Sequence, residues 1–511
     1  MSGRRRPVTF WTAFGWGLTD VMGGGSGAII GAYFLFFLTT FAGLSALEAA
    51  TIIGVARLID MVANVVVGSV SDRLYRTAVG RRFGRRRFFL LLGIPLMLTF
   101  GLLWTTGGGF WYYFLVFVAF DLAQSIVMVP YETLPSEMTD DYRERTLMST
   151  MRMLFSGLAG SVATLLTGAL LAVMGKDDPA AYGVMGAVFA VVFAIVVSIT
   201  YLTSWERDPT PEMLRELESD RRSARGRRGG VLRTVWSEIR EYGSTLRLPI
   251  FARHLGIYLS GVTAQDVFSA VLMYYVVFSL GLDAAVGSVL LGVGIVAVPL
   301  TPLWGYLFFR LGPARLYRIG FGMVIVSVGA YYALFAFRPA DAAVVGVAIG
   351  VSVVYQAFKS IVYFVPWNVF PFIPDVDEAV SGKRREGRFA GMMNFSRKAT
   401  SSVATIVVGA VLTAIGFEPG AVAQTPAVQW GIATTMLVGV GGLTALALLL
   451  AARFPLTRQS HLVLVAELDR LRRGGSTDDV DPGVRRTVER LTSTSYERLH
   501  SFHTADALDT R

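Results

Sequence analysis

The sequence contains no cysteine, which excludes disulfide bonds, thiolate metal sites and cysteine nucleophiles. Charged side chains are also scarce, at 16% of residues, whereas soluble domains carry about 25%. The four histidines lie away from the centres of the apolar segments, so proton chemistry there has to use a carboxylate. We find no glycine-rich phosphate loop, metal-ligand cluster or nucleophile–base pair, and therefore expect neither an enzyme nor a bound cofactor.

Long apolar segments are what the sequence has in abundance. Hydrophobic residues make up 53% of the chain, and the mean hydropathy is +0.53. A segment of about 20 apolar residues is long enough to span a bilayer. Twelve such segments lie near residues 14–40, 47–70, 88–106, 110–135, 148–174, 182–204, 252–279, 285–309, 317–337, 343–365, 390–415 and 428–452. The sequence therefore predicts an all-α membrane protein with twelve transmembrane helices.

The net charge of +10 comes from arginines in alternate loops between the apolar segments. Cytoplasmic loops of membrane proteins are enriched in Lys and Arg. We therefore expect a multi-pass protein of the cell membrane with both termini in the cytoplasm, and no nucleic-acid partner. No short apolar core with a small-residue cleavage site follows the basic N-terminus, so we expect a retained first helix rather than a signal peptide.

An internal repeat indicates two halves. Val129–Tyr131 followed by Pro135 has the same spacing as Val365–Trp367 followed by Pro371. We predict an N-terminal six-helix bundle, a cytoplasmic linker with an amphipathic helix, a second six-helix bundle and a cytoplasmic tail, at residues 1–205, 206–250, 251–455 and 456–511. We expect the tail to be a solvated extension that carries no chemistry.

Four sequence motifs indicate a particular kind of membrane protein. They are FGWGLTDVMGG in the first segment, ARLIDMVAN in the second with an arginine-rich loop after it, PYETLPSEMTDDYRERTLMSTMRM across the fourth and fifth, and DVDEAVSGKRREGRFAGMMNFSRKA before the eleventh. Together they resemble the glycoside–pentoside–hexuronide:cation symporters of the major facilitator superfamily, over roughly residues 10–455. The resemblance implies two six-helix bundles that hold a small-molecule substrate between them and alternate between outward-facing and inward-facing states.

The resemblance also implies roles for individual residues. By position, Asp20 and Arg152 match the acid and base that contact the sugar. Asp60 matches the first of two cation-binding carboxylates, Ser125 a hydroxyl ligand of the cation, and Lys398 the lysine that faces the carboxylates. The residues themselves leave alternatives open. A static ion pair would explain Asp60 and Lys398, and close helix packing would explain the segment around Asp20. Arg152 could extend its side chain to the membrane interface.

Three positions depart from the family pattern. Asn64 stands in place of the second carboxylate, Met128 in place of a sugar-binding acid, and Glu132 in place of an aromatic residue one turn later. Arg57 shares a helix face with Asp60, and we expect it to neutralise that carboxylate. The resemblance also places Trp367 near an aromatic residue beside the sugar. Polar candidates for the substrate cavity, or alternatively for hydrogen bonds between helices, are Gln124, Tyr363 and Asn394; further polar residues in apolar segments are Asp121, Asp266, Gln356 and Lys359.

Charged residues in the loops of one side are candidates for gating. Cations and acids there would form latches that hold the outward-facing state, although each cation is equally explained as a topology signal. The candidates are Asp72, Arg73, Arg85, Arg86, Arg145 and Asp375.

We predict a secondary active transporter, a cation-coupled symporter of a sugar or glycoside that works as a monomer in membrane lipid. With one carboxylate facing one lysine the empty cation site is close to neutral, so we expect H⁺ rather than Na⁺ as the coupling ion, or transport without a coupling ion. Two alternatives stay open: a carrier of an amphiphile such as a lysolipid, which the apolar Met128 favours, and a non-transporting membrane sensor on the same fold.

Overall fold

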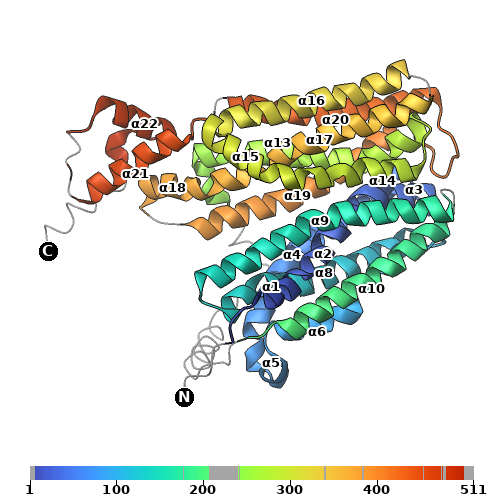
Figure 1. Cartoon of the computed structure of the whole chain (residues 1–511), viewed down its shortest axis with the longest axis horizontal. Helices are drawn as coiled ribbons and strands as arrows, with labels where there is room; N and C mark the ends of the chain where they lie inside the picture. The colour runs from blue at the N-terminus through green and yellow to red at the C-terminus, as the bar shows by residue number, and fades with distance from the viewer. Residues whose placement is uncertain are drawn as a thin grey trace. The chain divides into compact units, whose positions relative to one another are not determined.

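A computed structural model describes residues 6–175, 178–206, 240, 242–338, 341–382, 385–452, 454–473, 475 and 479–499. All the elements formed by these residues are helices (Figure 1). The expectation of an all-α protein is therefore confirmed. The predicted linker at 206–250 falls mostly outside the described residues.

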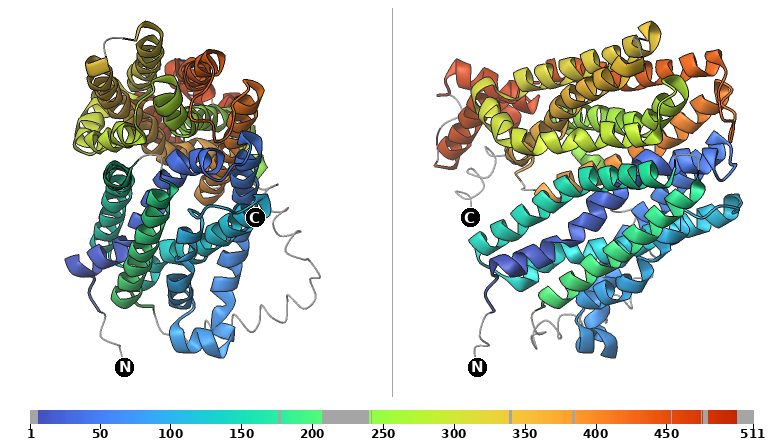
Figure 2. Two further views of the ribbon diagram at one scale, coloured as in Figure 1. Left: turned by 90° about the vertical axis from the view of Figure 1, so that its right-hand side faces the viewer. Right: turned by 45° about the vertical axis from the view of Figure 1, so that its right-hand side comes forward.

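The first half of the chain forms a series of long helices with short connections. The elements are α1 (Phe10–Gly17), α2 (Thr19–Ile29), a π-helical turn (Ile30–Phe34), α3 (Leu35–Thr40), α4 (Ala46–Arg73), α5 (Ala78–Phe83), α6 (Arg87–Leu96), α7 (Thr99–Leu102), α8 (Phe110–Met138), α9 (Tyr142–Met174) and α10 (Pro179–Thr203). Helix α4 packs along α8, and α2 packs along α9 (Figures 1 and 2).

The second half repeats this pattern. Its elements are α13 (Pro249–Tyr274), a π-helical turn (Tyr275–Ser279), α14 (Ala284–Gly292), α15 (Ala297–Leu311), α16 (Pro313–Phe337), α17 (Asp341–Val369), α18 (Ile373–Ser381), α19 (Glu386–Ala414), α20 (Pro426–Ala452), α21 (Arg458–Arg472) and α22 (Pro482–Thr492). The prolines of the repeat occupy matching places, since Pro130 lies inside α8 and Pro366 inside α17.

Ten helical segments of the described chain are long and apolar enough to cross a membrane. The two other predicted spans correspond to the shorter apolar segment Arg87–Leu102 and to α19, which is 29 residues long but carries several charges near its start. Local sequence signals set the ends of these helices. Ser45 and Glu48 form a capping box at the start of α4, and Gly175 ends α9 with a φ of 98°, which favours glycine.

The chain divides into two compact units that interleave in sequence. Unit 1 comprises residues 1–235, 269–295 and 401–435, and unit 2 comprises residues 236–268, 296–400 and 436–511. The boundaries cut through α13, α19 and α20. Unit 1 therefore contains the first six predicted spans together with end segments of helices from the second half of the chain.

Contacts inside unit 1 join the two halves of the sequence at the end of the helices where α3 stops. The Tyr33 hydroxyl donates to Ser288 at 2.7 Å, and the hydroxyls of Thr39 and Tyr274 lie 2.8 Å apart. The backbone N–H of Gly420 donates to the carbonyl of Thr39 at 3.0 Å. Direct hydrogen bonds between the two halves of the sequence therefore close this end of unit 1.

The tail packs against unit 2 instead of extending into solvent. Leu464 and Leu468 of α21 and Leu491 of α22 are buried in the same apolar core as Ile373 and Val376 of α18. The described part of the tail forms the helices α21 and α22. The expectation of a solvated extension is wrong for the described tail residues, because their apolar faces find a partner in the loop helix α18.

Candidate functional site

The first polar cluster surrounds Asp20, at the start of α2 in unit 1. The Asp20 side chain is only 5% exposed, and one of its carboxylate oxygens lies 2.9 Å from Nε of Arg152 on α9. The Tyr131 hydroxyl on α8 donates to the same oxygen at 2.7 Å. Asp20 and Arg152, which the sequence predicted as substrate contacts, therefore lie together. Their hydrogen bonds offset the cost of placing charged groups among apolar helices.

A second carboxylate completes this cluster from α8. Glu132 Oε1 lies 2.6 Å from the terminal nitrogen of Arg152, and the Glu132 side chain is half exposed. Met128, one turn earlier on α8, lies against α2, since a Cβ built on Gly23 would be 3.2 Å from its methyl carbon. The two acids and one guanidinium give the cluster one net negative charge and several free donor and acceptor positions.

Aromatic rings line the cluster, and the sequence interpretation missed them. The ring of Trp16 stacks on that of Tyr131 with centroids 4.6 Å apart, and the guanidinium carbon of Arg152 lies 5.6 Å from the Tyr131 centroid. Aromatic faces beside polar groups suit a ring that carries both C–H and hydroxyl groups. The signal for Tyr131 was its place beside Pro130 in the repeated motif, which we used for topology alone.

The other predicted cavity residues lie apart from this cluster or in unit 2. Gln124 on α8 donates to Ser26 on α2 at 3.1 Å, which is the helix-to-helix contact that the sequence left open. In unit 2, Trp367 is 42% exposed and packs edge-on against Tyr258 with centroids 6.0 Å apart. Asn394 is exposed on α19. Trp367 and Asn394 belong to unit 2 and Asp20 to unit 1, so their place in one cavity stays a prediction.

The predicted cation-site residues of α4 and α8 do lie together. The amide nitrogen of Asn64 donates to Oδ1 of Asp60 at 3.0 Å and to the Ser125 hydroxyl at 3.1 Å. The Ser125 hydroxyl in turn donates to Oδ1 of Asp60. One carboxylate, one hydroxyl and one amide thus form a compact set of polar groups inside unit 1.

Arg57 and Lys398 are the expected partners of Asp60. Arg57 donates to the Ser401 hydroxyl at 2.6 Å, so its long side chain reaches α19. The expectation that Arg57 neutralises Asp60 stays a prediction. Lys398 lies half-buried on α19 and belongs to unit 2, whereas Asp60 belongs to unit 1, so their pairing stays a prediction.

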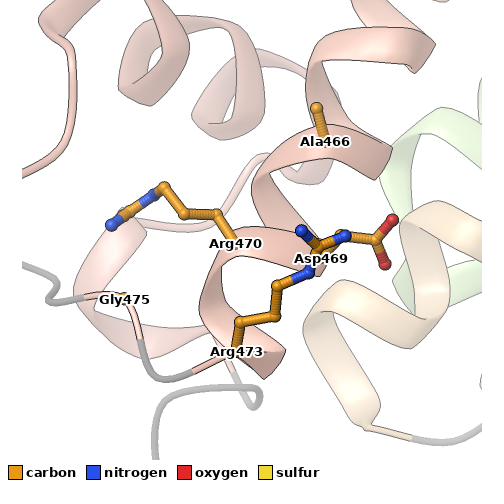
Figure 3. Close-up of a pocket in the computed structure, with 5 residues that line it drawn as sticks. All are labelled: Ala466, Asp469, Arg470, Arg473 and Gly475. Atoms are coloured by element: carbon orange, nitrogen blue, oxygen red, sulfur yellow. The ribbon is translucent and has the colours of Figure 1, made fainter.

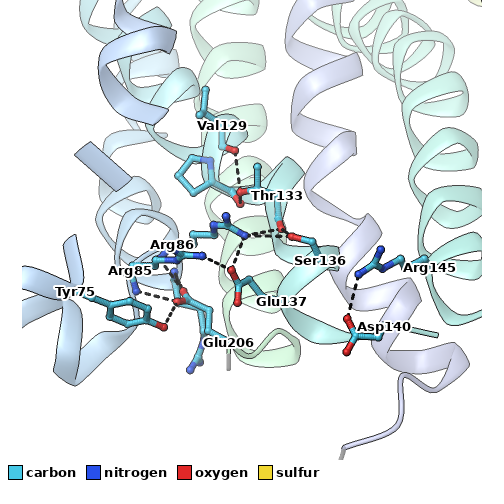
Figure 4. A network of polar contacts seen from close by, with 12 residues as sticks. Tyr75, Arg85, Arg86, Val129, Thr133, Ser136, Glu137, Asp140, Arg145 and Glu206 are labelled. Atoms are coloured by element: carbon cyan, nitrogen blue, oxygen red, sulfur yellow. Dashed lines mark hydrogen bonds and ion pairs between the residues drawn. The ribbon is translucent and has the colours of Figure 1, made fainter. Parts of the chain in front are cut away.

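A network of charges connects the predicted gating residues of unit 1 with acids that the sequence interpretation missed (Figure 4). Arg85 and Arg86 both form ion pairs with Glu137 at the end of α8, the second at 3.1 Å. Arg86 also donates to the carbonyl of Thr133 at 2.7 Å. These arginines therefore tie the start of α6 to the end of α8.

Glu206, after α10, lies at the centre of the same network. It accepts backbone N–H bonds from Arg85 at 2.9 Å and Arg86 at 2.7 Å, and the Tyr75 hydroxyl donates to it at 2.9 Å. These N–H groups belong to the start of α6, where helix amides lack partners of their own. Burial and the neighbouring Glu206 carboxylate raise the pKa of Tyr75.

The remaining gating candidates either have partners nearby or have side chains that the structure does not describe. Arg145 forms an ion pair with Asp140 at 3.4 Å, and an Asp375 carboxylate oxygen lies 2.8 Å from Nε2 of His461 in the tail. The side chains of Asp72 and Arg73 lie outside the described residues. The proposed latches thus remain predictions, although Arg85, Arg86, Arg145 and Asp375 each have a partner.

Unit 2 contains a third polar cluster, in its apolar helices. Asp266 on α13 binds Arg397 on α19 through two contacts of 2.5 and 2.8 Å, and Lys359 on α17 donates to Gln356 at 2.9 Å. The sequence marked Asp266 and Lys359 as polar residues in apolar segments but assigned them no role. The signal that was missed is the adjacent Arg397–Lys398 pair, of which only the lysine was considered.

A surface pocket of 620 Å³ opens in the tail, lined by Ala466, Asp469, Arg470, Arg473 and Gly475 (Figure 3). Among the lining residues, Arg470 forms an ion pair with Glu467 at 2.8 Å. In the described part of the chain, His, Asp and Glu side chains do not cluster in a way that would hold a metal ion.

Known proteins are similar to this chain along most of its length. The model of a family described as "MFS/sugar transport protein" matches residues 15–458. A glucuronide carrier protein homolog of Escherichia coli is 25% identical over 90% of this chain and 96% of its own. A sodium-dependent lysophosphatidylcholine symporter of Danio rerio is 22% identical over 93% of this chain and 91% of its own.

Solved structures show a similar fold. A bacterial homolog of the human lysosomal transporter Spinster, in an inward-facing and unoccupied conformation, aligns with a TM-score of 0.61 at 15% identity and covers 88% of this chain and 98% of its own. The nucleoside transporter NupG aligns with a TM-score of 0.57 at 12% identity and covers 88% and 99%.

Proposed function

Because the chain belongs to the MFS/sugar transport protein family, we propose that it is a cation-coupled symporter of a sugar or glycoside. It is an all-α membrane protein with the major facilitator fold, and its family consists of transporters rather than enzymes. It sits in lipid and handles a small molecule. We also propose that it works as a monomer in the cell membrane, and that both termini lie in the cytoplasm; the arginine-rich loops support this orientation.

The observation that carries the proposal is the cluster of Asp20, Tyr131, Arg152 and Glu132 inside unit 1. Its carboxylates accept hydrogen bonds, its guanidinium and hydroxyl donate them, and Trp16 offers an aromatic face. A sugar presents this same mixture of donors, acceptors and C–H surface. Charged groups in apolar helices are retained where they contact water or a ligand, which supports a role in binding.

We propose H⁺ as the coupling ion, taken up by Asp60. Its neighbours Asn64 and Ser125 supply neutral groups only, so one carboxylate carries the charge of this set. A proton needs a single basic atom, whereas Na⁺ needs several oxygen ligands and gains from a second negative charge. Alternating access then requires the hydrogen bonds of Tyr33 and Thr39 to open in the outward-facing state.

The test is uptake by purified protein in liposomes, with a panel of neutral glycosides and uronides, under a pH gradient and then under a Na⁺ gradient at fixed pH. We expect uptake of at least one sugar, and its loss in Asp20→Asn with the protein still folded. Gln124→Ala is the matched control, because Gln124 contacts Ser26 rather than the cluster. Absence of sugar uptake in every condition would overturn the proposal.

A lysolipid carrier is the second candidate. Met128 makes the wall beside Gly23 apolar, and a relative of similar length is named as a lysophosphatidylcholine symporter. The same liposomes distinguish the two functions, since a lysolipid carrier stimulates transfer of lysophosphatidylcholine and leaves glycosides outside.

A further inference from the structure

The polar cluster of unit 2 contains more positive than negative side chains. Asp266 and Arg397 neutralise each other through two parallel contacts of 2.8 and 2.5 Å, an arrangement that fixes both side chains. Lys359 lies on α17 beside them and feels the charge of Asp266. Two cations, Lys359 and Arg397, therefore share the one acid Asp266 in this cluster.

Lys359 has no acid of its own in the described part of the chain. Its ammonium donates one hydrogen bond, to the side-chain oxygen of Gln356 at 2.9 Å, and forms no ion pair there. An ammonium has three donors. Two of them are therefore available, next to a guanidinium that is already in place.

The depth of Lys359 in the helix makes this excess charge significant. Lys359 lies ten residues before the end of α17, which corresponds to about 15 Å of helix, or half of a hydrocarbon core of about 30 Å. Helical side chains lean toward the helix N-terminus, and the bond to Gln356 holds the ammonium in that direction. Lys359 therefore does not extend toward the nearer interface.

The surroundings of Lys359 indicate an aqueous path and not lipid. Tyr363 and Trp367 follow at intervals of four residues on the same face of α17, and their side chains are 40% and 42% exposed. Tyr363 also lies within hydrogen-bonding reach of Arg397. Ionised side chains in a membrane span face a water-filled cavity or the protein interior, and a water-filled cavity accounts for the exposure of this face of unit 2.

We infer that Lys359 is the principal donor of an anion-binding site on this face, with Arg397, held by Asp266, as the second donor. The ligand is a carboxylate or phosphate group of the transported solute. This inference rests on the proposed transport function and deepens it, because it predicts that the solute carries a negative charge. The excess positive charge of unit 2 is then neutralised when the solute is bound.

Matched pairs of probes test the inference on the purified full-length protein in nanodiscs. The first pair is 4-nitrophenyl β-D-glucuronide and 4-nitrophenyl β-D-glucoside, which differ by a carboxylate. The second is 1-oleoyl lysophosphatidic acid and monooleoylglycerol, which differ by a phosphate group. We expect the charged member of one pair to bind about tenfold more tightly or better, measured by calorimetry or by ligand-induced thermal stabilisation. The pair that discriminates identifies the source of the anionic group.

Variants assign the preference to a residue. Lys359→Gln should bring the two members of that pair within about twofold of each other, whereas Lys359→Arg should keep most of the preference. Arg315→Gln, which removes an exposed cation of the same unit, should change nothing. Equal binding of charged and neutral probes by the unmodified protein overturns the inference, and this result does not depend on whether a variant folds.

The outcomes also separate this inference from the proposed function. If a neutral glycoside is transported as well as its charged counterpart, the anion site is wrong and the transporter stands. If Lys359→Gln folds and retains the full preference, an anion is bound elsewhere and the assignment to Lys359 fails. If no member of either pair is bound or transported, both proposals fail.

Discussion

Glu132 and Arg152 are joined by a contact of 2.6 Å between a carboxylate oxygen and a guanidinium nitrogen. Glu132 lies four residues, one helical turn, beyond Met128, the position at which the family pattern implies a sugar-binding acid. An acid therefore lies one turn later on the same face of α8, where it contacts Arg152. Because Arg152 also binds Asp20, it lies between two carboxylates.

We expect Glu132→Gln to weaken substrate binding by only a few fold. The Glu132 side chain is 50% exposed, and ion pairs of this exposure contribute about 0.2–1 kcal/mol. Asp20→Asn should cost far more, because its carboxylate is buried and accepts bonds from Tyr131 and Arg152. Such charged hydrogen bonds contribute about 1.5–3 kcal/mol, or about ten- to a hundredfold in affinity. Substrate titrations of the two variants check the order; a larger loss in Glu132→Gln would contradict it.

The second prediction concerns the coupling ion. Asn64→Asp places a second carboxylate beside Asp60 and Ser125, and we expect it to create or strengthen a response to Na⁺. An added charge at about 4–5 Å changes the interaction by about 3–4 kcal/mol at an effective dielectric near 20, or hundreds-fold in affinity. The measurement is uptake under a Na⁺ gradient at fixed pH, with Asn64→Ser as the control. Strong Na⁺ dependence of the unmodified protein would show that a single carboxylate suffices.

The third prediction concerns Glu206, which accepts backbone bonds at the start of α6 (Figure 4). Glu206→Gln removes a charge that the helix dipole favours and weakens a cap, so the free energy of unfolding should fall by about 0.5–2 kcal/mol. Thermal unfolding and hydrogen exchange of the segment 85–90 report the loss. Asp140→Asn is the control, because its pair with Arg145 is about half exposed and should contribute about 0–1 kcal/mol. Equal effects of the two substitutions would argue against a capping role.

The fourth prediction concerns the pH dependence of the tail. Burial acts to raise the pKa of Glu467, but hydrogen bonds from Arg470 and Tyr496 outweigh it, and the pKa is lowered. Burial and the bond to Glu467 raise the pKa of Tyr496 to about 12. The stabilisation from Glu467 is therefore present above the ordinary carboxyl pKa of about 4.3 and is lost as the pH falls below it. The stabilisation from Tyr496 is present below about pH 10 and is lost as the pH rises toward 12.

Hydrogen exchange of residues 458–499, corrected for the intrinsic rate at each pH, should thus show constant protection between about pH 5 and 9 and falling protection outside this range. Glu467→Gln should lower protection within the plateau and remove the decrease on the acid side. An acid-side decrease of the same size in that variant would assign it to another group. Peptides from α16 provide the reference within the same sample.

Much of the site was visible in the sequence because its elements are local. Asp60 and Asn64 lie three and seven residues after Arg57 on one regular helix, so their shared face follows from periodicity alone. The length and hydropathy of the apolar segments fixed the helices in the same way. The resemblance of four motifs then placed Asp20, Arg152 and Ser125 in one family pattern.

Only the tertiary structure decided which charges meet. Arg57 has a carboxylate one turn away on its own helix, yet it reaches Ser401, which is 344 residues distant in sequence. In the sequence, Glu137 and Glu206 are not distinguished from other acids near the ends of apolar segments. The structure shows that both contact Arg86 at the start of α6. The pairing of Asp266 with Arg397, which leaves Lys359 with the excess charge, likewise depends on three helices meeting. Periodicity fixes the face on which a side chain lies, whereas its partner depends on packing between segments far apart in the chain.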